Sequence, residues 1–109
     1  MLTKLIGTAL KFRQHKIDRY DILSEEIQRG VLSRLISKSR HTEWGTRYGY
    51  ENIRDYEQFA LRVPVSDYDG LKSYIDRMRH GERDILWPGR VKWYAKSSGT
   101  TNDKSKFIP

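Results

Sequence analysis

The sequence predicts an α+β fold, with about four N-terminal helices followed by a C-terminal β-hairpin. Two observations lead to this prediction. Apolar residues recur at helical spacing in several segments of residues 1–86, and from residue 91 onward apolar and polar residues alternate as they do in a strand. The 109 residues are enough for one small domain. We therefore expect a helical segment, residues 1–86, and a strand–loop–strand segment, residues 91–109, within a single domain.

The first helix is expected at the N-terminus, where an apolar stripe has the spacing of an amphipathic helix. Its members are Leu2, Leu5, Ile6, Ala9 and Leu10. A second helix is expected to begin at Ser24, whose side chain can cap it, and to bury apolar residues within 27–36. We expect the first stripe to pack against this second helix or against the rest of a larger protein. A single stripe without a lipid anchor would hold a membrane only weakly, so no stable membrane association is predicted.

Residues 41–53, HTEWGTRYGYENI, are rich in aromatic residues and glycine. The segment has no clear helical period, which favours an ordered loop. We expect its aromatic side chains to hold this loop in place, namely those of Trp44, Tyr48 and Tyr50.

Two further helices follow. Asp55 can begin a short one, with Gln58 at the reciprocal capping position, and Pro64 ends it. Ser66 is expected to cap the next helix, and Gly81 stands where a left-handed terminator belongs. The apolar positions of this helix are Tyr68, Leu71, Ile75 and Met78.

A strand is expected after the Pro88-Gly89 turn, because apolar or small residues alternate there with polar ones. Val91, Trp93 and Ala95 form one series, and Lys92, Tyr94 and Lys96 form the other. The last four residues, KFIP, resemble the start of a second strand. The loop between the two strands carries the most distinctive chemistry of the chain.

That loop, residues 96–106, reads KSSGTTNDKSK. Gly99 lets a backbone N–H approach an oxyanion closely, hydroxyl groups around it can donate hydrogen bonds, and Lys106 adds a positive charge. The hydroxyl residues are Ser97, Ser98, Thr100 and Thr101. The Walker pattern G-x-x-x-x-G-K-[ST] is absent. The pattern alone allows either a phosphate-binding loop or a plain hairpin turn.

Composition narrows the class of protein. The net charge is +7, from 21 basic and 14 acidic residues, and the basic residues are scattered along the chain. The chain has no cysteine, so a reducing compartment such as the cytoplasm is the default. No apolar run approaches the ~20 residues of a membrane-spanning helix. The histidines at 15, 41 and 80 lack the spacing of a helical metal pair, and we predict no metal site within this chain.

A family resemblance adds to these patterns. Residues 93–109, WYAKSSGTTNDKSKFIP, resemble the first nucleotide-binding motif of the auxin-responsive Gretchen-Hagen family of acyl-acid amido synthetases. That family is part of the adenylate-forming superfamily. Residues 41–82 also resemble the helical lead-in of these proteins, particularly bacterial members. The resemblance covers essentially the whole chain. Asp103 departs from the motif, where a second glycine would be usual.

The resemblance implies that the ATP phosphates lie on the loop and that Lys106 is the lysine of the motif. The expected phosphate-binding residues are therefore Ser97, Ser98, Gly99, Thr100, Thr101 and Lys106. It further implies a full-length enzyme that uses ATP and Mg²⁺ to activate a small carboxylic acid and passes the acyl group to an amine, or to a thiol. This chain would be the N-terminal part of a larger adenylate-forming α/β domain. We expect it to contain no catalytic residue and to be inactive without the remainder.

Two other classes of protein remain as alternatives. A small basic nucleic-acid-binding module would account for the charge and for the aromatic residues near it, and it would bind with a steep salt dependence. A helical interaction module without catalysis would account for the apolar stripes. The family resemblance favours the ligase, for which no nucleic acid partner is expected.

Overall fold

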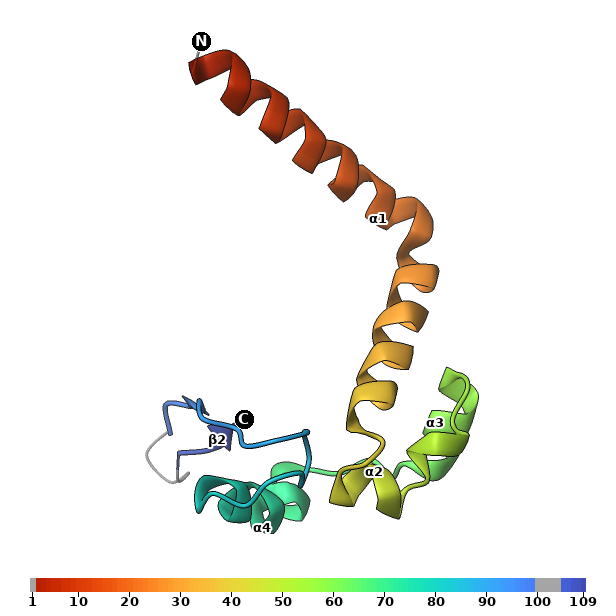
Figure 1. Ribbon diagram of the computed structural model, residues 1–109, viewed down its shortest axis with the longest axis vertical. Helices are drawn as coiled ribbons and strands as arrows, with labels where there is room; N and C mark the ends of the chain where they lie inside the picture. The colour runs from red at the N-terminus through yellow and green to blue at the C-terminus, as the bar shows by residue number, and fades with distance from the viewer. Residues whose placement is uncertain (1, 100–104) are drawn as a thin grey trace. The chain divides into compact units, whose positions relative to one another are not determined.

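A computed structural model describes residues 2–99 and 105–109 of the chain. Helices come first and a small antiparallel sheet comes last, which confirms the predicted order (Figure 1). The elements are α1 (Leu2–Ser39), α2 (Glu43–Arg47), the 3₁₀ helix η1 (Tyr50–Asn52), α3 (Tyr56–Arg62), α4 (Tyr68–Arg79), β1 (Ala95–Lys96) and β2 (Phe107–Ile108). The chain divides into two compact units, Met1–Leu32 and Ser33–Pro109.

The N-terminal helical stretch agrees with the prediction of two helices. It is labelled α1 as a single element, but two helices join across a kink at Leu23, where the backbone leaves helical dihedrals (φ −116°, ψ 19°). The kink lies next to Ser24, where the sequence predicts that the second helix begins. Ile6 and Leu10 are 52% and 59% exposed, so the first stripe is not covered within the first unit. The side chains of Leu2 and Leu5 lie outside the described part.

In the second unit, a buried polar corner turns the chain from α1 into α2. The Thr42 hydroxyl donates to the Ser39 carbonyl at 2.7 Å and accepts from the Gly45 amide at 3.0 Å, and Thr42 is 1% exposed. A Cβ at Gly45 would lie 2.1 Å from the Ser39 carbonyl oxygen. Only glycine fits this close approach, and the corner thus fixes where α2 begins.

The segment predicted as an aromatic loop is instead folded into α2 and η1. Thr42 caps α2, and the amides of Glu43 and Trp44 donate to the carbonyls of Asp84 and Ile85 at 2.8 and 3.1 Å. These distant carbonyls satisfy N–H groups that a helix of this length leaves free. The predicted aromatic packing is present for Trp44 and Tyr48, whose ring centroids are 4.6 Å apart.

Helices α3 and α4 both have side-chain N-caps, as the sequence predicts. Two of the predicted capping contacts are displaced by one residue. Asp55 accepts from the Gln58 amide at 2.8 Å as predicted, but the Gln58 side chain returns to the amide of Arg54 rather than that of Asp55. The cap of α4 is Asp67, which accepts from the Gly70 amide at 2.9 Å. The prediction of Ser66 as this cap was wrong, because the adjacent Asp67 occupies the capping position.

A small apolar core holds the second unit together. Its buried members are Ile36, Ile53, Ile75, Met78 and Ile85. Ile75 and Met78 confirm the predicted buried face of α4, and Gly81 ends this helix with φ +99° as expected. The following turn is closed by Asp84, which accepts from the Gly89 amide at 2.6 Å. Gly89 has φ +77°, consistent with the predicted Pro-Gly turn.

The hairpin lies beside α4, and its strands are shorter than predicted. Ala95 pairs with Ile108 and Lys96 with Phe107 in antiparallel register. Residues 91–94 were predicted as strand and are not, because no partner strand pairs with them in the described part and Trp93 is 87% exposed.

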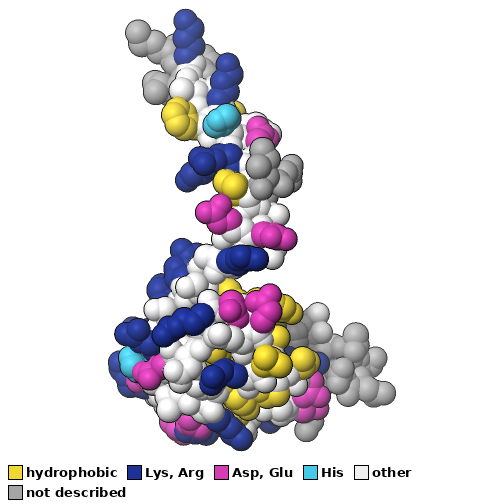
Figure 2. Space-filling view, turned by 90° about the vertical axis from the view of Figure 1, so that its right-hand side faces the viewer, with side chains coloured by type: hydrophobic (Ala, Val, Ile, Leu, Met, Phe, Trp, Pro, Cys, Tyr) yellow, Lys and Arg dark blue, Asp and Glu magenta, His cyan; other side chains and the backbone are white. Residues whose placement is uncertain are grey.

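The surface carries mixed charge. On the face shown in Figure 2, Lys and Arg side chains are interspersed with Asp and Glu rather than gathered in one patch. Among residues 2–99 and 105–109, no helix has the length and apolar character needed to cross a membrane.

Candidate functional site

Ser97 and Lys106 close the foot of the predicted phosphate loop. The Ser97 amide donates to the Lys106 carbonyl at 2.9 Å, and the Lys106 amide donates to the Ser97 hydroxyl oxygen at 2.9 Å. The pair continues the β1–β2 ladder by one step, since Lys96 and Phe107 are the preceding partners. The Ser97 hydroxyl oxygen therefore helps to close the base of the loop by accepting from the Lys106 amide.

The other predicted loop residues divide into two groups. Ser98, Gly99 and Lys106 are exposed at the loop end of the hairpin, where an anion can approach them. Thr100 and Thr101 lie outside the described residues, as do Asp103 and Lys104. The structure thus brings Ser97 and Lys106 together across the hairpin loop, and Ser98 and Gly99 are exposed beside them.

Helix α4 supports the second strand of the hairpin. The Phe107 amide donates to the Tyr68 hydroxyl at 2.9 Å. The Arg79 guanidinium lies 3.6 Å from the centroid of the Phe107 ring, and the Lys106 ammonium lies 5.6 Å from the centroid of the Tyr68 ring. Tyr68 was predicted only as an apolar position of the helix, and Arg79 was not singled out. No local pattern reveals them, because Tyr68 and Phe107 are 39 residues apart.

A hollow of about 510 Å³ lies between α4, the segment before β1, and β2. Three of its lining side chains are cationic, and the Tyr94 hydroxyl in its wall is buried without a hydrogen-bond partner in the described part. The lining residues are Met78, Arg79, Arg90, Val91, Lys92, Tyr94 and Phe107. Positive charge is therefore concentrated where the hairpin meets α4. Such charge favours the binding of anionic ligands nearby.

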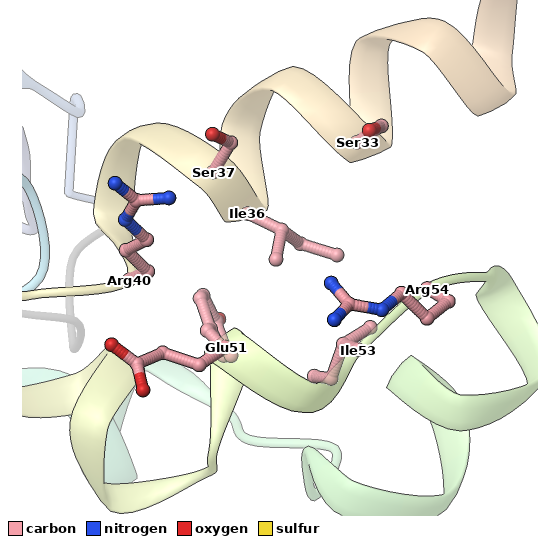
Figure 3. A pocket seen from close by; sticks show the side chains of 8 residues that line it. Ser33, Ile36, Ser37, Arg40, Glu51, Ile53 and Arg54 are labelled. Atoms are coloured by element: carbon pink, nitrogen blue, oxygen red, sulfur yellow. The ribbon is translucent and has the colours of Figure 1, made fainter.

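A second cavity, of about 410 Å³, lies in the same unit between the end of α1 and η1 (Figure 3). The buried side chains of Ile36 and Ile53 lie in it, and Arg40 and Arg54 stand at its sides. None of the predicted site residues lines this cavity. The described residues contain no group of three His, Asp or Glu side chains suited to a metal ion.

An ion-pair network fixes α2 against the end of α4. Arg77 donates to both carboxylate oxygens of Glu43, at 3.0 and 2.8 Å, and to Glu82 at 2.8 Å. The hydrogen bond from Arg77 holds the pKa of Glu43 below its ordinary value, and the hydrogen bonds to Glu43 and Glu82 raise the pKa of Arg77. Arg77 precedes Met78 and Arg79, so the network steadies the end of α4 that faces the hairpin.

Comparisons with known proteins match the sequence of this chain to a family N-terminal domain and to much longer chains. Residues 13–109 match GH3, described as the GH3 family N-terminal domain. The chain is 33% identical over 94 residues to indole-3-acetic acid-amido synthetase GH3.8 of Oryza sativa subsp. indica, covering 85% of this chain and 16% of that protein. It is 30% identical over 104 residues to jasmonoyl–L-amino acid synthetase JAR6 of Nicotiana attenuata, covering 91% of this chain and 18% of that protein.

These matches identify the chain as a domain that it shares with amido synthetases. The chain belongs to the GH3 family, the family indicated by its loop motif. It spans only 16% and 18% of the length of these two relatives. Both of the relatives named above are plant proteins, so they lend no support to the expected likeness to bacterial members in particular.

Proposed function

We propose that the chain is the N-terminal part of an ATP-dependent ligase that joins a small carboxylic acid to an amine acceptor, through an acyl adenylate. The observation that carries the proposal is the match to the GH3 N-terminal domain over residues 13–109, which includes the loop closed by Ser97 and Lys106. The names of the relatives, one an indole-3-acetic acid-amido synthetase and one a jasmonoyl–L-amino acid synthetase, support the amine acceptor.

The reaction has two steps. A carboxylate oxygen of the acid attacks the α-phosphorus of ATP, the bond to the bridging oxygen breaks, and pyrophosphate leaves. The amine nitrogen then attacks the acyl carbon, an amide forms, and AMP leaves as the nitrogen loses a proton. The first step gathers charge on the departing pyrophosphate. Fixed hydrogen-bond donors and cations aimed at that charge lower its barrier.

The loop supplies groups of this kind. In the proposal, Ser98, the backbone around Gly99, Thr100 and Thr101 donate to the phosphate oxygens, and Lys106 places its ammonium against the β- or γ-phosphate. Ser97 acts mainly as the brace that keeps Lys106 at the foot of the loop, since its oxygen accepts from the Lys106 amide. A loop already closed before ATP arrives loses less conformational entropy on binding.

Magnesium is expected to accompany ATP, but the described residues do not bring together three carboxylate or imidazole side chains. We therefore assign no magnesium ligand in this part of the chain and derive no step from the ion. Adenine, ribose, acid and acceptor would be bound by other parts of the full-length enzyme. We expect the 109-residue chain alone to be inactive and the full-length enzyme to act in the cytoplasm.

The test is acid-dependent exchange between ATP and labelled pyrophosphate in the full-length protein, followed by amide formation with a panel of amino acids. The proposal expects exchange only when a suitable carboxylic acid is present, and product only when an amine is added. Tight RNA or DNA binding that weakens steeply with salt, without exchange for any acid of a broad panel, would instead favour a nucleic-acid-binding protein.

A further inference from the structure

Phe107 is held from α4 at two points. Tyr68 and Arg79 begin and end this helix, and about three helical turns separate them, so that they lie on nearly the same face. Their long side chains converge on Phe107, where Tyr68 accepts from the backbone amide at 2.9 Å and Arg79 covers the ring at 3.6 Å. The residue next to Phe107 is Lys106, the predicted phosphate ligand.

We call Tyr68 and Arg79, with the Phe107 that they contact, the clamp. Other residues of α4 and of the hairpin hold the two side chains of the clamp in place. Asp67 caps the first turn of α4, immediately before Tyr68. Arg79 lies 3.5 Å from the Asp76 carboxylate, and Lys72 donates to the same carboxylate at 2.9 Å, so the guanidinium has an anionic neighbour beside the Phe107 ring. The Lys96 ammonium, on the paired strand, is 5.9 Å from that ring. The clamp therefore connects a capped helix to both strands of the hairpin.

Tyr68 also reaches Lys106 directly. The Lys106 ammonium is 5.6 Å from the centroid of the Tyr68 ring, within the range in which an aromatic face attracts a cation. Lys106 has no ion pair with a carboxylate in residues 2–99 and 105–109, so the ring is the contact found for its charged end. Among the described residues no carboxylate neutralises this ammonium, so it can attract a phosphate.

We infer that Tyr68 and Arg79 are positioning residues, which hold Phe107 so that the Lys106 ammonium is presented to the ATP phosphates. The inference rests on the proposed function. Neither residue needs to touch ATP. Tyr68 fixes the backbone at Phe107 and steers the ammonium with its ring, while Arg79 fixes the Phe107 side chain. Loss of either contact leaves the hairpin paired but lets Lys106 sample more positions.

The test measures ATP–pyrophosphate exchange of the full-length protein as a function of ATP concentration. Tyr68→Phe removes the hydroxyl acceptor and keeps the ring, so the ATP concentration for half-maximal exchange should rise about two- to tenfold, as for loss of one hydrogen bond. Tyr68→Leu also removes the ring and should raise it further. Arg79→Met should have an effect similar to that of Tyr68→Phe. The matched controls Tyr56→Phe and Arg83→Met, both at exposed positions, should behave as the wild type.

A double-mutant cycle separates positioning from general destabilisation. If Tyr68 acts through Lys106, adding Tyr68→Phe to Lys106→Ala should raise the half-saturating ATP concentration little further. Additive effects, or a Tyr68→Phe variant that equals Tyr56→Phe, would overturn the inference while the proposed function stands. Absence of exchange in the wild type would instead defeat the proposed function, and the role toward ATP with it.

The clamp has a readout that does not depend on activity. Hydrogen exchange measured by mass spectrometry across residues 105–109 should be faster in Tyr68→Phe than in Tyr56→Phe, because the Phe107 amide loses its acceptor. Equal exchange in the two variants would show that Tyr68 does not hold the strand.

Discussion

Ser97 and Lys106 exchange two hydrogen bonds across the foot of the loop, each of 2.9 Å, one between backbone groups and one from the Lys106 amide to the Ser97 hydroxyl. The side chain of Ser97 thereby replaces a backbone acceptor at the point where strand pairing stops. Two adjacent serines consequently have different roles. Ser97 shapes the loop, whereas Ser98 is exposed, and we expect Ser98 to meet the ligand.

Ser97→Ala should loosen the loop without breaking the strands. The Lys106 amide loses its acceptor, and a hydrogen bond of this kind contributes about 0.5–1.5 kcal/mol. Amide hydrogen exchange at Lys106 should therefore speed up by about two- to tenfold. Ser98→Ala is the matched control and should leave this amide unchanged. An equal effect of the two substitutions would show that Ser97 is not the brace.

Gly45→Ala should destabilise the protein by about 1–3 kcal/mol or more, because the new Cβ would lie 2.1 Å from the backbone oxygen of Ser39, which cannot turn aside. Gly30→Ala supplies the contrast. Nothing lies within 4 Å of its Cβ position, and alanine is the better helix former, so a gain of about 0.5–1 kcal/mol is expected. Urea unfolding of the two variants measures both changes in the free energy of unfolding. A Gly45→Ala variant as stable as the wild type would contradict the close packing of this corner.

Glu43→Gln should remove a pH-dependent part of the stability. The bond from Arg77 holds the folded-state pKa of Glu43 below its ordinary value, so its contribution is present above the unfolded-state pKa of about 4.3 and is lost as the pH falls through the lower folded-state value. The difference between wild type and variant should thus be largest near neutral pH and vanish in acid. It should also shrink in high salt, because both side chains are partly exposed.

Urea midpoints from pH 3 to 7 measure this effect. Glu57→Gln is the control, since Glu57 is exposed and forms no ion pair in the described part of the chain. A wild-type advantage over Glu43→Gln that stays constant down to pH 3 would mean that the ion pair with Arg77 does not form.

Features with local causes could be predicted from the sequence. The buried face of α4 at Ile75 and Met78 follows from helical periodicity, and the left-handed backbone at Gly81 and Gly89 follows from the lack of a side chain. The hairpin around the hydroxyl-rich loop was also predicted, although the alternation of residues 91–96 placed the start of its first strand too early, since only Ala95 and Lys96 pair. Where two neighbouring residues were equally able to cap α4, as with Ser66 and Asp67, the pattern could not choose between them.

Features with distant causes could not be predicted. Helix α2 depends on the carbonyls of Asp84 and Ile85, and the support of the hairpin depends on Tyr68 and Arg79, all far away in the chain. Neither contact leaves a periodic signal. The candidate site itself was found from loop chemistry and from the family motif, and the structure adds the division of roles between Ser97 and Lys106.

The central claim is that Lys106 and Gly99 bind the ATP phosphates, and ATP–pyrophosphate exchange of full-length Lys106→Ala tests it most directly. A charge-assisted contact contributes about 1.5–3 kcal/mol, so exchange should fall by about ten- to a hundredfold while circular dichroism stays native. Lys104→Ala, as the matched control, should matter less, and Gly99→Val should be worse than either because its branched side chain fills the space of the phosphate. Unchanged exchange in both Lys106→Ala and Gly99→Val, with the fold intact, would mean that the loop is only a hairpin turn.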